Sequence, residues 1–198
     1  PIYIEEKLSD RFLRKNPEAD KTIIRGEKYV TYGDFLDANG ISQYLKMMYG
    51  DIDIYDNNVN ILRTQFLSPI ADMGPSFYRY YITDTVEQEG IKLIKLYFTP
   101  RNPNDLIFRG YMLITLDGNY GVQKINMTIS KNANLNWARE LRITQDYEKA
   151  TDGRFHLIKS NMLAEFALTQ NASGGVMGER SVSFKKFKTD IPAHDSIY

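Results

Sequence analysis

Between Phe77 and Phe166 the sequence alternates apolar and polar residues in short runs, and turn-forming glycines separate these runs. Successive side chains of a strand point to opposite faces of a sheet, so the alternation predicts strands with one covered and one water-facing side. The turn signals Glu89-Gly90, Asp117-Gly118 and Asp152-Gly153 each stand between two such runs. The segment is therefore predicted to be a meander of antiparallel hairpins. This pattern indicates an architecture but no chemistry.

Two of the predicted strands allow their faces to be assigned. The later strand places on one face Leu141, Ile143, Gln145 and Tyr147, and on the other face Arg142, Thr144, Asp146 and Glu148. The earlier strand places on one face Ile125, Met127 and Ile129, and on the other face Lys124, Asn126 and Thr128. Full charges on one face favour a sheet in water over a barrel wall in lipid, where those charges would have to line a lumen. We expect a helical segment over residues 40–64 to cover the apolar face.

The region before the meander has a mixed pattern. Pro1 to Glu6 is predicted to be a short strand, and the polar stretch Lys7 to Asp20, with its Asn16-Pro17 turn signal, a connection across the surface. A helix is predicted over residues 40–50, where apolar residues recur at helical spacing between Ser42 and Gly50. A second short helix is predicted from Asn58 to Thr64.

We expect residues 1–198 to form a single domain, because a chain of this length can bury roughly 70% of its unfolded surface. Within it, residues 1–76 contribute a strand, helices and loops, and residues 77–190 the meander. After a loop from Asn171 to Gly178, a last edge strand is predicted from Ser181 to Phe187. The predicted fold class is mainly β, within the α+β class. It is a strongly curved antiparallel sheet or half-barrel covered by short helices.

The composition excludes several classes of function. Lys and Arg together number 25, as do Asp and Glu, so no excess charge favours nucleic acid as a partner. The absence of cysteine excludes disulfides, thiolate metal sites and a cysteine nucleophile. No apolar run reaches the roughly 18 residues of a helical membrane span.

Candidate catalytic and metal-binding motifs fail on their spacing. Residues 51–58 are rich in Asp, but Asp56 stands where a calcium loop needs Gly and Leu62 where it needs Glu. His156 and His194 belong to no metal-ligand or nucleophile motif. We therefore predict no catalytic residue, no metal site and no cofactor.

Tyrosine is the one residue type in excess, with 14 copies, and aromatic residues concentrate in the first hairpins of the meander. Such residues could line a groove for an apolar or extended ligand, such as an acyl chain, a sugar or a peptide. The candidate binding residues are Tyr78, Tyr80, Tyr97, Tyr111 and Trp137. The alternative is structural, because aromatic pairs across strands stabilise a sheet by about 0.2–1 kcal/mol each.

Several short segments, in order along nearly the whole chain, carry a family resemblance. They are Pro1-Ile2-Tyr3-Ile4-Glu5-Glu6 with Ser9, Arg14-Lys15-Asn16-Pro17, Ile54-Tyr55-Asp56-Asn57, Phe66-Leu67-Ser68-Pro69-Ile70, Phe98-Thr99-Pro100 with Phe108-Arg109-Gly110, Asn132-Ala133-Asn134-Leu135-Asn136, and Gln145-Asp146-Tyr147. The set resembles a poorly characterised family of envelope proteins from Bacteroidota-type bacteria. Its members join a carboxypeptidase-regulatory-like β-sandwich, a middle domain and a C-terminal outer-membrane β-barrel.

The resemblance implies that this chain is the middle domain of a longer protein. Its partners would be the β-sandwich and the barrel of the parent chain, and its place the periplasmic side of the outer membrane, in the cell envelope. The Phe108-x-Gly110 strand and Leu116-Asp117 turn are also similar to the repeating hairpin of lipoprotein-carrier folds. We expect a non-enzymatic binding or docking module with a lipid or peptide ligand. The alternatives are a structural spacer without ligand and a hydrolase of envelope polymers.

Overall fold

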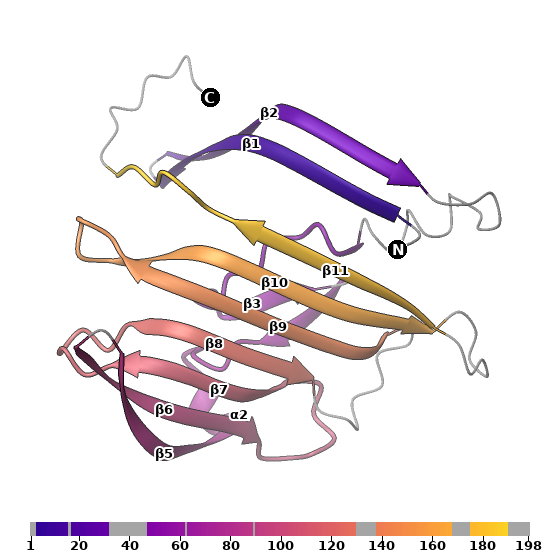
Figure 1. Ribbon diagram of the computed structural model, residues 1–198. Helices are drawn as coiled ribbons and strands as arrows, with labels where there is room; N and C mark the ends of the chain where they lie inside the picture. Colours follow the sequence, from indigo (N-terminus) through magenta and orange to yellow (C-terminus); the bar gives the residue numbers. More distant parts are fainter. Residues whose placement is uncertain are drawn as a thin grey trace. The chain divides into compact units, whose positions relative to one another are not determined.

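The computed structural model describes residues 3–15, 17–31, 47–61, 63–88, 90–129, 138–167 and 175–189 (Figure 1). The chain divides into two compact units, one of residues 1–41 with 188–198 and one of residues 42–187. The single domain expected over residues 1–198 stays a prediction. Strands dominate the described residues of both units, as the mainly β prediction requires, and helix is scarce among them: α2 (Gly74–Phe77) has four residues.

The described part of the first unit is a long hairpin. Strand β1 (Tyr3–Lys15) pairs antiparallel with β2 (Glu18–Thr31), and the chain reverses at the predicted turn. The surface connection expected over Lys7 to Asp20 is wrong, because most of this stretch lies in β1. Its charged residues pair across the hairpin, as in the ion pair between Arg11 Nη2 and Asp20 Oδ2 at 2.6 Å. Arg11 and Asp20 are diagonal neighbours in the strand register. Opposite charges on neighbouring positions of paired strands stabilise the pairing, so a polar sequence can still form strands.

The second unit is built on a seven-stranded antiparallel sheet. Its strands are β5 (Tyr78–Gln88), β6 (Ile91–Pro100), β7 (Phe108–Thr115), β8 (Val122–Ile129), β9 (Ala138–Lys149), β10 (Phe155–Ala167) and β11 (Gly175–Ser183). Neighbours in sequence are neighbours in the sheet, which runs from β5 to β11 without closing into a barrel. The predicted meander is confirmed.

Three predicted turns have the backbone conformation that favours glycine. Gly90, Gly118 and Gly153 have φ angles of +77°, +87° and +78°, which residues with a Cβ rarely adopt. The end of the meander differs from the prediction. Strand β11 begins at Gly175, inside the expected loop, and ends at Ser183, four residues before the expected end.

One face of the sheet is covered by residues 47–77, which precede it in sequence. Figure 1 shows β3 (Asn58–Ile61) and α2 on the far side of the sheet. The predicted helix from Asn58 to Thr64 is wrong, because β3 forms a hairpin with β4 (Thr64–Leu67) and Arg63 turns at a φ of +65°. Exposed and buried residues alternate strictly along β3, as they do in a strand. Residues 40–46, most of the other predicted helix, lie outside the described ranges.

The core lies between this cover and the sheet. The cover contributes the buried side chains Met48, Ile52, Ile54, Val59, Ile61 and Phe66. They meet buried residues of every sheet strand from β5 to β10, and the Phe66 and Phe108 rings pack with centroids 5.0 Å apart. The face assignments for β8 and β9 are confirmed, because their predicted apolar faces are buried here. The cover consists mainly of irregular chain and a hairpin, not of the expected short helices.

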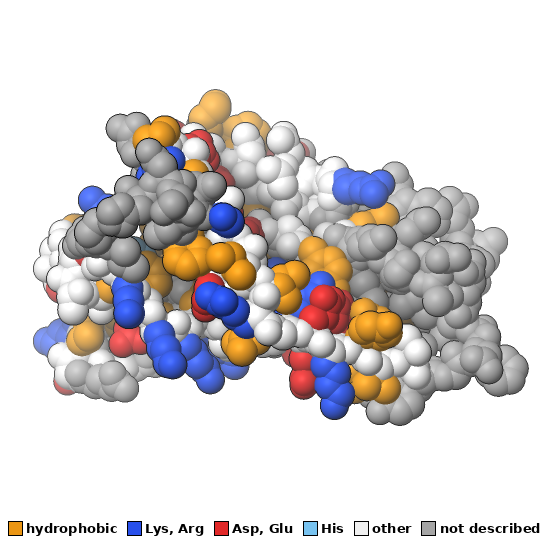
Figure 2. All heavy atoms as spheres, turned by 90° about the horizontal axis from the view of Figure 1, so that it is seen from above, with side chains coloured by type: hydrophobic (Ala, Val, Ile, Leu, Met, Phe, Trp, Pro, Cys, Tyr) orange, Lys and Arg blue, Asp and Glu red, His pale blue; other side chains and the backbone are white. Residues whose placement is uncertain are grey.

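Charge is mixed over the molecule, in line with the equal numbers of acidic and basic residues. Figure 2 shows Lys and Arg side chains interspersed with Asp, Glu and hydrophobic side chains on the side seen from above. Within the described ranges, no helix has the length and hydropathy that crossing a membrane would require.

Candidate functional site

Two of the predicted binding tyrosines lie on the covered face of the sheet. Tyr78 is fully buried, and its hydroxyl donates to the Leu67 carbonyl at 2.7 Å and accepts from the Phe108 N–H at 3.2 Å. The Tyr80 hydroxyl donates to the Pro69 carbonyl at 2.8 Å. Burial raises the pKa of both phenols. In this arrangement the two hydroxyls bind the cover to the sheet.

The covered face also holds a buried polar network. Gln145 Nε2 donates to the Ile52 carbonyl at 2.7 Å, and the Tyr147 hydroxyl donates to Gln145 Oε1 at 3.0 Å. Burial raises the pKa of Tyr147. The buried amide of Gln145 thus has hydrogen-bond partners for both its nitrogen and its oxygen. Its bond to the Ile52 carbonyl joins β9 to the cover.

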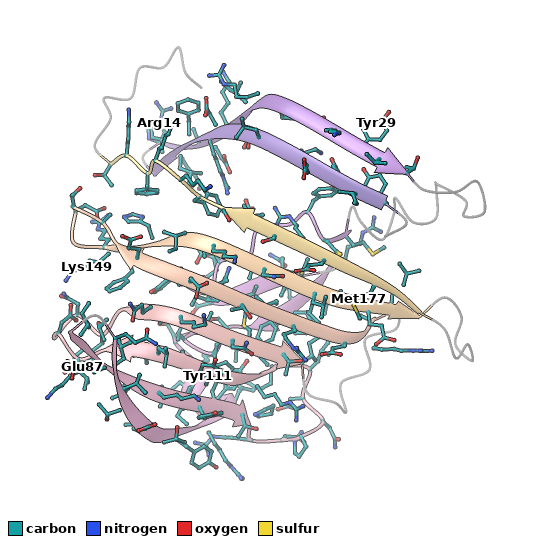
Figure 3. All side chains as sticks on the ribbon, viewed as in Figure 1. Arg14, Tyr29, Glu87, Tyr111, Lys149 and Met177 are labelled. Atoms are coloured by element: carbon teal, nitrogen blue, oxygen red, sulfur yellow. The ribbon has the colours of Figure 1, made fainter. Side chains whose placement is uncertain are left out.

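The other two described candidates, Tyr97 and Tyr111, lie on the opposite face, which we call the open face. Their rings pack with centroids 5.6 Å apart and planes inclined by 43°. Lys95 Nζ lies 5.1 Å from the Tyr97 centroid and 4.4 Å from the Tyr111 centroid, within the range of cation–π contacts. A hydrogen bond with Tyr97 raises the pKa of Lys95. Figure 3 labels Tyr111 on β7. The structure thus divides the predicted set between two faces, and Trp137 lies outside the described ranges.

The strand register places these tyrosines in one row across the whole sheet. From β5 to β11 this open-face row consists of Tyr81, Tyr97, Tyr111, Asn126, Thr144, Asn161 and Ser181. Asn126 Nδ2 donates to Thr144 Oγ1 at 3.1 Å, so neighbouring polar members of the row are bonded to each other. Three aromatic rings are therefore followed by four amide or hydroxyl side chains.

A hollow of about 500 Å³ opens at the aromatic end of this row. Its lining residues are Tyr81, Thr83, Tyr97, Phe98, Thr99, Arg109, Gly110, Asn126 and Thr128. The pairing of β6 with β7 ends at Phe98 and Gly110. Beyond that point the Phe108 N–H turns to the Tyr78 hydroxyl, so Thr99 and Arg109 lie beside the gap where the strands part.

Gly110 is required by the close approach of β7 to β8. A Cβ at this position would lie 2.0 Å from the Asn126 carbonyl oxygen and 2.9 Å from the Met127 Cα. Both contacts are with backbone, so no side-chain movement could relieve them. Glycine here permits the strands to approach beside the hollow.

The hollow contains a cation for which the described residues offer no neutralising partner. Among the described residues no carboxylate lies within ion-pairing distance of the Arg109 guanidinium, and none of the lining residues is acidic. Two other basic residues of the open face are neutralised: Lys124 Nζ lies 2.8 Å from Asp146, and Arg142 Nη2 lies 2.7 Å from Glu140. Arg109 is thus available to an anionic group of a ligand.

Sites for metal or acid–base chemistry are not evident in the part of the chain that the structure describes. No group of three His, Asp or Glu side chains is placed there to hold a metal ion. His156 Nε2 lies 2.9 Å from Asp152 Oδ2, and its ring packs on Phe187 with centroids 4.1 Å apart. This contact stabilises the turn between β9 and β10. His194 lies outside the described ranges.

Comparison with known proteins now gives a family. Residues 2–179 match the family described as "Family of unknown function (DUF5686)". The chain belongs to this family. No curated protein and no solved structure matches the chain. The membership agrees with the resemblance to an uncharacterised family, while the bacterial group, the neighbouring domains and the likeness to lipoprotein carriers stay predictions.

Sequence reasoning missed the residues that shape the hollow. Tyr81, Arg109 and Gly110 were not among the candidates, although Tyr81 follows Tyr80 directly and so must face the other side of the sheet. The signal for Gly110 was a glycine within an otherwise regular strand, which marks a close backbone approach. Arg109 had no signal, because its lack of a partner is a property of the folded chain.

Proposed function

We propose that this chain is a non-enzymatic binding module and that the hollow on the open face holds its ligand. The observation that carries the proposal is the combination of exposed aromatic rings with an unneutralised arginine in one open depression. Tyr81 is 50% exposed and Tyr97 is 38% exposed, although both occupy the middle of paired strands. Exposed aromatic side chains beside a cation are typical of ligand sites and have no role in the core.

The size and lining of the hollow support binding more than catalysis. Its volume of about 500 Å³ lies within the roughly 300–1,000 Å³ of small-molecule sites. Its side chains are aromatic, hydroxyl, amide and guanidinium groups, which stack on a ligand and orient it by hydrogen bonds. None of the described lining residues is a histidine or a carboxylate that could serve as a general base.

The proposed setting is the periplasmic side of an outer membrane, between a β-sandwich and a membrane barrel of the same parent chain. It is supported by the order of the resembling segments along the sequence. In that setting the open face would meet an extended ligand of the envelope or dock against the neighbouring barrel.

Native mass spectrometry tests the proposal. The protein is incubated with a protein-free extract of bacterial envelopes, desalted and weighed. We expect a discrete added mass on the wild-type chain and its loss in Thr99→Trp, whose indole would fill the hollow. Tyr120→Ala is the matched control, because Tyr120 is 66% exposed and does not line the hollow. An added mass that persists in Thr99→Trp would place binding elsewhere, and no added mass at all would favour a structural spacer.

A further inference from the structure

The open-face row continues beyond the hollow, and its chemistry indicates a class of ligand. We infer that the ligand is a linear acidic glycan that lies across the strands, with its sugar rings along the open-face row and an acidic group at Arg109. This inference rests on the proposed function, since it names the ligand of the same site. Three features of the described residues carry it.

The first feature is the spacing of the aromatic rings. Tyr81, Tyr97 and Tyr111 are directly paired across β5, β6 and β7, so their backbones are separated by about 4.8 Å from strand to strand. This interval is close to the length of one hexose unit in an extended chain. The C–H faces of a pyranose ring are apolar and pack on aromatic rings, while its hydroxyls stay in water. Tyr81 and Tyr97, which are 50% and 38% exposed, suit that kind of contact.

The second feature is the polar half of the row. Asn126, Thr144, Asn161 and Ser181 continue the line with amides and hydroxyls, the kinds of group that exchange hydrogen bonds with sugar hydroxyls. Asn126 Nδ2 already donates to Thr144 Oγ1 and Asn161 Nδ2 to Glu179 Oε1, so the remaining donors and acceptors of the row would bind the sugar. Seven strands give the row a length of roughly 29 Å, enough for several sugar units. No member of the row has an aliphatic side chain. An acyl chain would find little apolar surface here beyond the tyrosines, so the row favours a glycan over a lipid.

The third feature is charge. Arg79 and Arg109 lie at strand positions of the open face beside Tyr81 and Tyr111, and no described carboxylate pairs with either. A guanidinium binds a carboxylate or a phosphate through two parallel hydrogen bonds. Lys95, between the rings of Tyr97 and Tyr111, adds positive charge to the same end of the row. Lys95 already faces Asp84 across the strand pair, so the charge that lacks a described anion is that of the two arginines. An acidic glycan would supply an anion to Arg79 and Arg109, for which the described residues offer none.

Nucleic acid is also an anionic polymer with rings that stack, but the open face fits it poorly. Lys124 and Arg142 are already neutralised by Asp146 and Glu140, and Glu179 adds a further carboxylate at the polar end. Nucleic-acid affinity depends on cations that neutralise successive phosphates. A few unpaired cations at one end of a mixed surface can bind only a few acidic groups of a polymer, so they do not favour nucleic acid.

Affinity electrophoresis through polymer-containing gels tests the inference. Two acidic polymers, carboxymethylcellulose and polygalacturonate, are compared with the neutral hydroxyethylcellulose, which shares the first polymer's backbone. We expect at least one acidic polymer to retard the wild-type chain, and carboxymethylcellulose to bind about tenfold more tightly than hydroxyethylcellulose. A tenfold change corresponds to about 1.4 kcal/mol, within the strength of a hydrogen bond to a charged group.

Variants separate the charge from the stacking. Arg109→Gln should lower the affinity for the acidic polymer about tenfold and leave the neutral polymer unchanged. Tyr97→Ala should weaken both polymers, and Tyr120→Ala neither. Arg109→Lys keeps the charge without the fork of donors, so we expect an intermediate affinity. Circular dichroism spectra that match the wild type confirm that each variant is folded.

The inference is overturned if neither acidic polymer retards the protein, if Arg109→Gln binds as the wild type does, or if oligothymidylate binds more tightly than either polymer. The proposed function is judged separately by the added mass that Thr99→Trp should abolish. A ligand detected in that experiment without polymer binding would refute the glycan and leave the binding module intact.

Discussion

The two faces of the seven-stranded sheet use the same residue type for opposite purposes. On β5, Tyr78 is fully buried and its hydroxyl makes two hydrogen bonds to the backbone of other segments. Three residues later, Tyr81 lies on the open face with half of its surface exposed. The difference follows from the period of two along a strand. The position of an aromatic residue along a strand decides which face of the sheet it lies on. Whether it is structural or available to a ligand then depends on whether other residues cover that face.

Polar groups follow the same division. On the covered face, Gln145 has its amide nitrogen and oxygen bonded to Ile52 and Tyr147. On the open face, Arg109 has no anionic partner among the described residues. A satisfied buried network specifies packing, whereas an unsatisfied cation at the surface is free to bind. Within the described ranges, the polar groups named on the covered face have partners, whereas Arg109 on the open face has no anionic one.

The largest loss of stability is expected when a buried ring is removed from the covered face. Phe108→Ala should lower the free energy of unfolding by about 3–5 kcal/mol, because it removes a fully buried ring that packs on Phe66. Urea unfolding followed by circular dichroism measures the change. Tyr97→Ala is the open-face counterpart and should cost no more than about 1 kcal/mol. Equal losses in the two variants would contradict the division between faces.

A smaller change isolates the hydroxyl groups. Tyr78→Phe should lower the free energy of unfolding by about 1–3 kcal/mol, because it leaves the Phe108 N–H and the Leu67 carbonyl buried without partners. Tyr97→Phe should change it by about 0.5 kcal/mol at most. Chemical denaturation of both variants under identical conditions makes the comparison. If the Tyr78 variant were as stable as the wild type, its hydroxyl would not connect the cover to the sheet.

The smallest effect is expected at a charged turn that belongs to neither face. Asp117, between β7 and β8, accepts hydrogen bonds from Thr115, Lys149 and the Asn119 N–H, and these lower the pKa of its carboxyl. A lowered folded-state pKa gives stability that is present above the unfolded pKa of about 3.9 and is lost as the pH falls further.

Asp117→Asn removes this contribution. Between pH 5 and pH 2, the variant should therefore lose less stability than the wild type, and the two curves should approach each other at the acid end. Thermal unfolding at several pH values measures both. A parallel loss in the two proteins would show that Asp117 does not contribute to acid sensitivity.

Much of the sheet could be predicted from local pattern. The alternation assigned the buried faces of β8 and β9 correctly, and Gly90, Gly118 and Gly153 marked turns where the backbone needs positive φ. The hairpin of β3 and β4 was mistaken for a helix. The four residues of β3 are too few to distinguish the periodicity of a helix from that of a strand. The strand predicted from Pro1 to Glu6 is confirmed from Tyr3 on as the start of β1. The rest of the first hairpin was missed because its stability includes ion pairs between residues distant in sequence.

The candidate site was predictable only in part. The excess of tyrosine in the first hairpins pointed to the correct end of the sheet, and it supplied Tyr97 and Tyr111. The excess of tyrosine could not distinguish Tyr78 and Tyr80, on the covered face, from Tyr97 and Tyr111, on the open face. The covered face is determined by the packing of residues 47–77 against the sheet. The hollow depends on the point at which the pairing of β6 and β7 ends, and no local signal indicates that point.

Hydroxyl-radical footprinting with and without an acidic polymer tests the central claim most directly. In the free protein, mass spectrometry should find Tyr81 and Tyr97 oxidised and Tyr78 protected. With carboxymethylcellulose present, Tyr81 and Tyr97 should become protected, while oxidation of the exposed Tyr120 stays constant and corrects for radicals consumed by the polymer. Protection of Tyr81 and Tyr97 already in the free protein would show that the open face is covered. Their unchanged oxidation when the polymer is added would show that this face is not where the polymer binds.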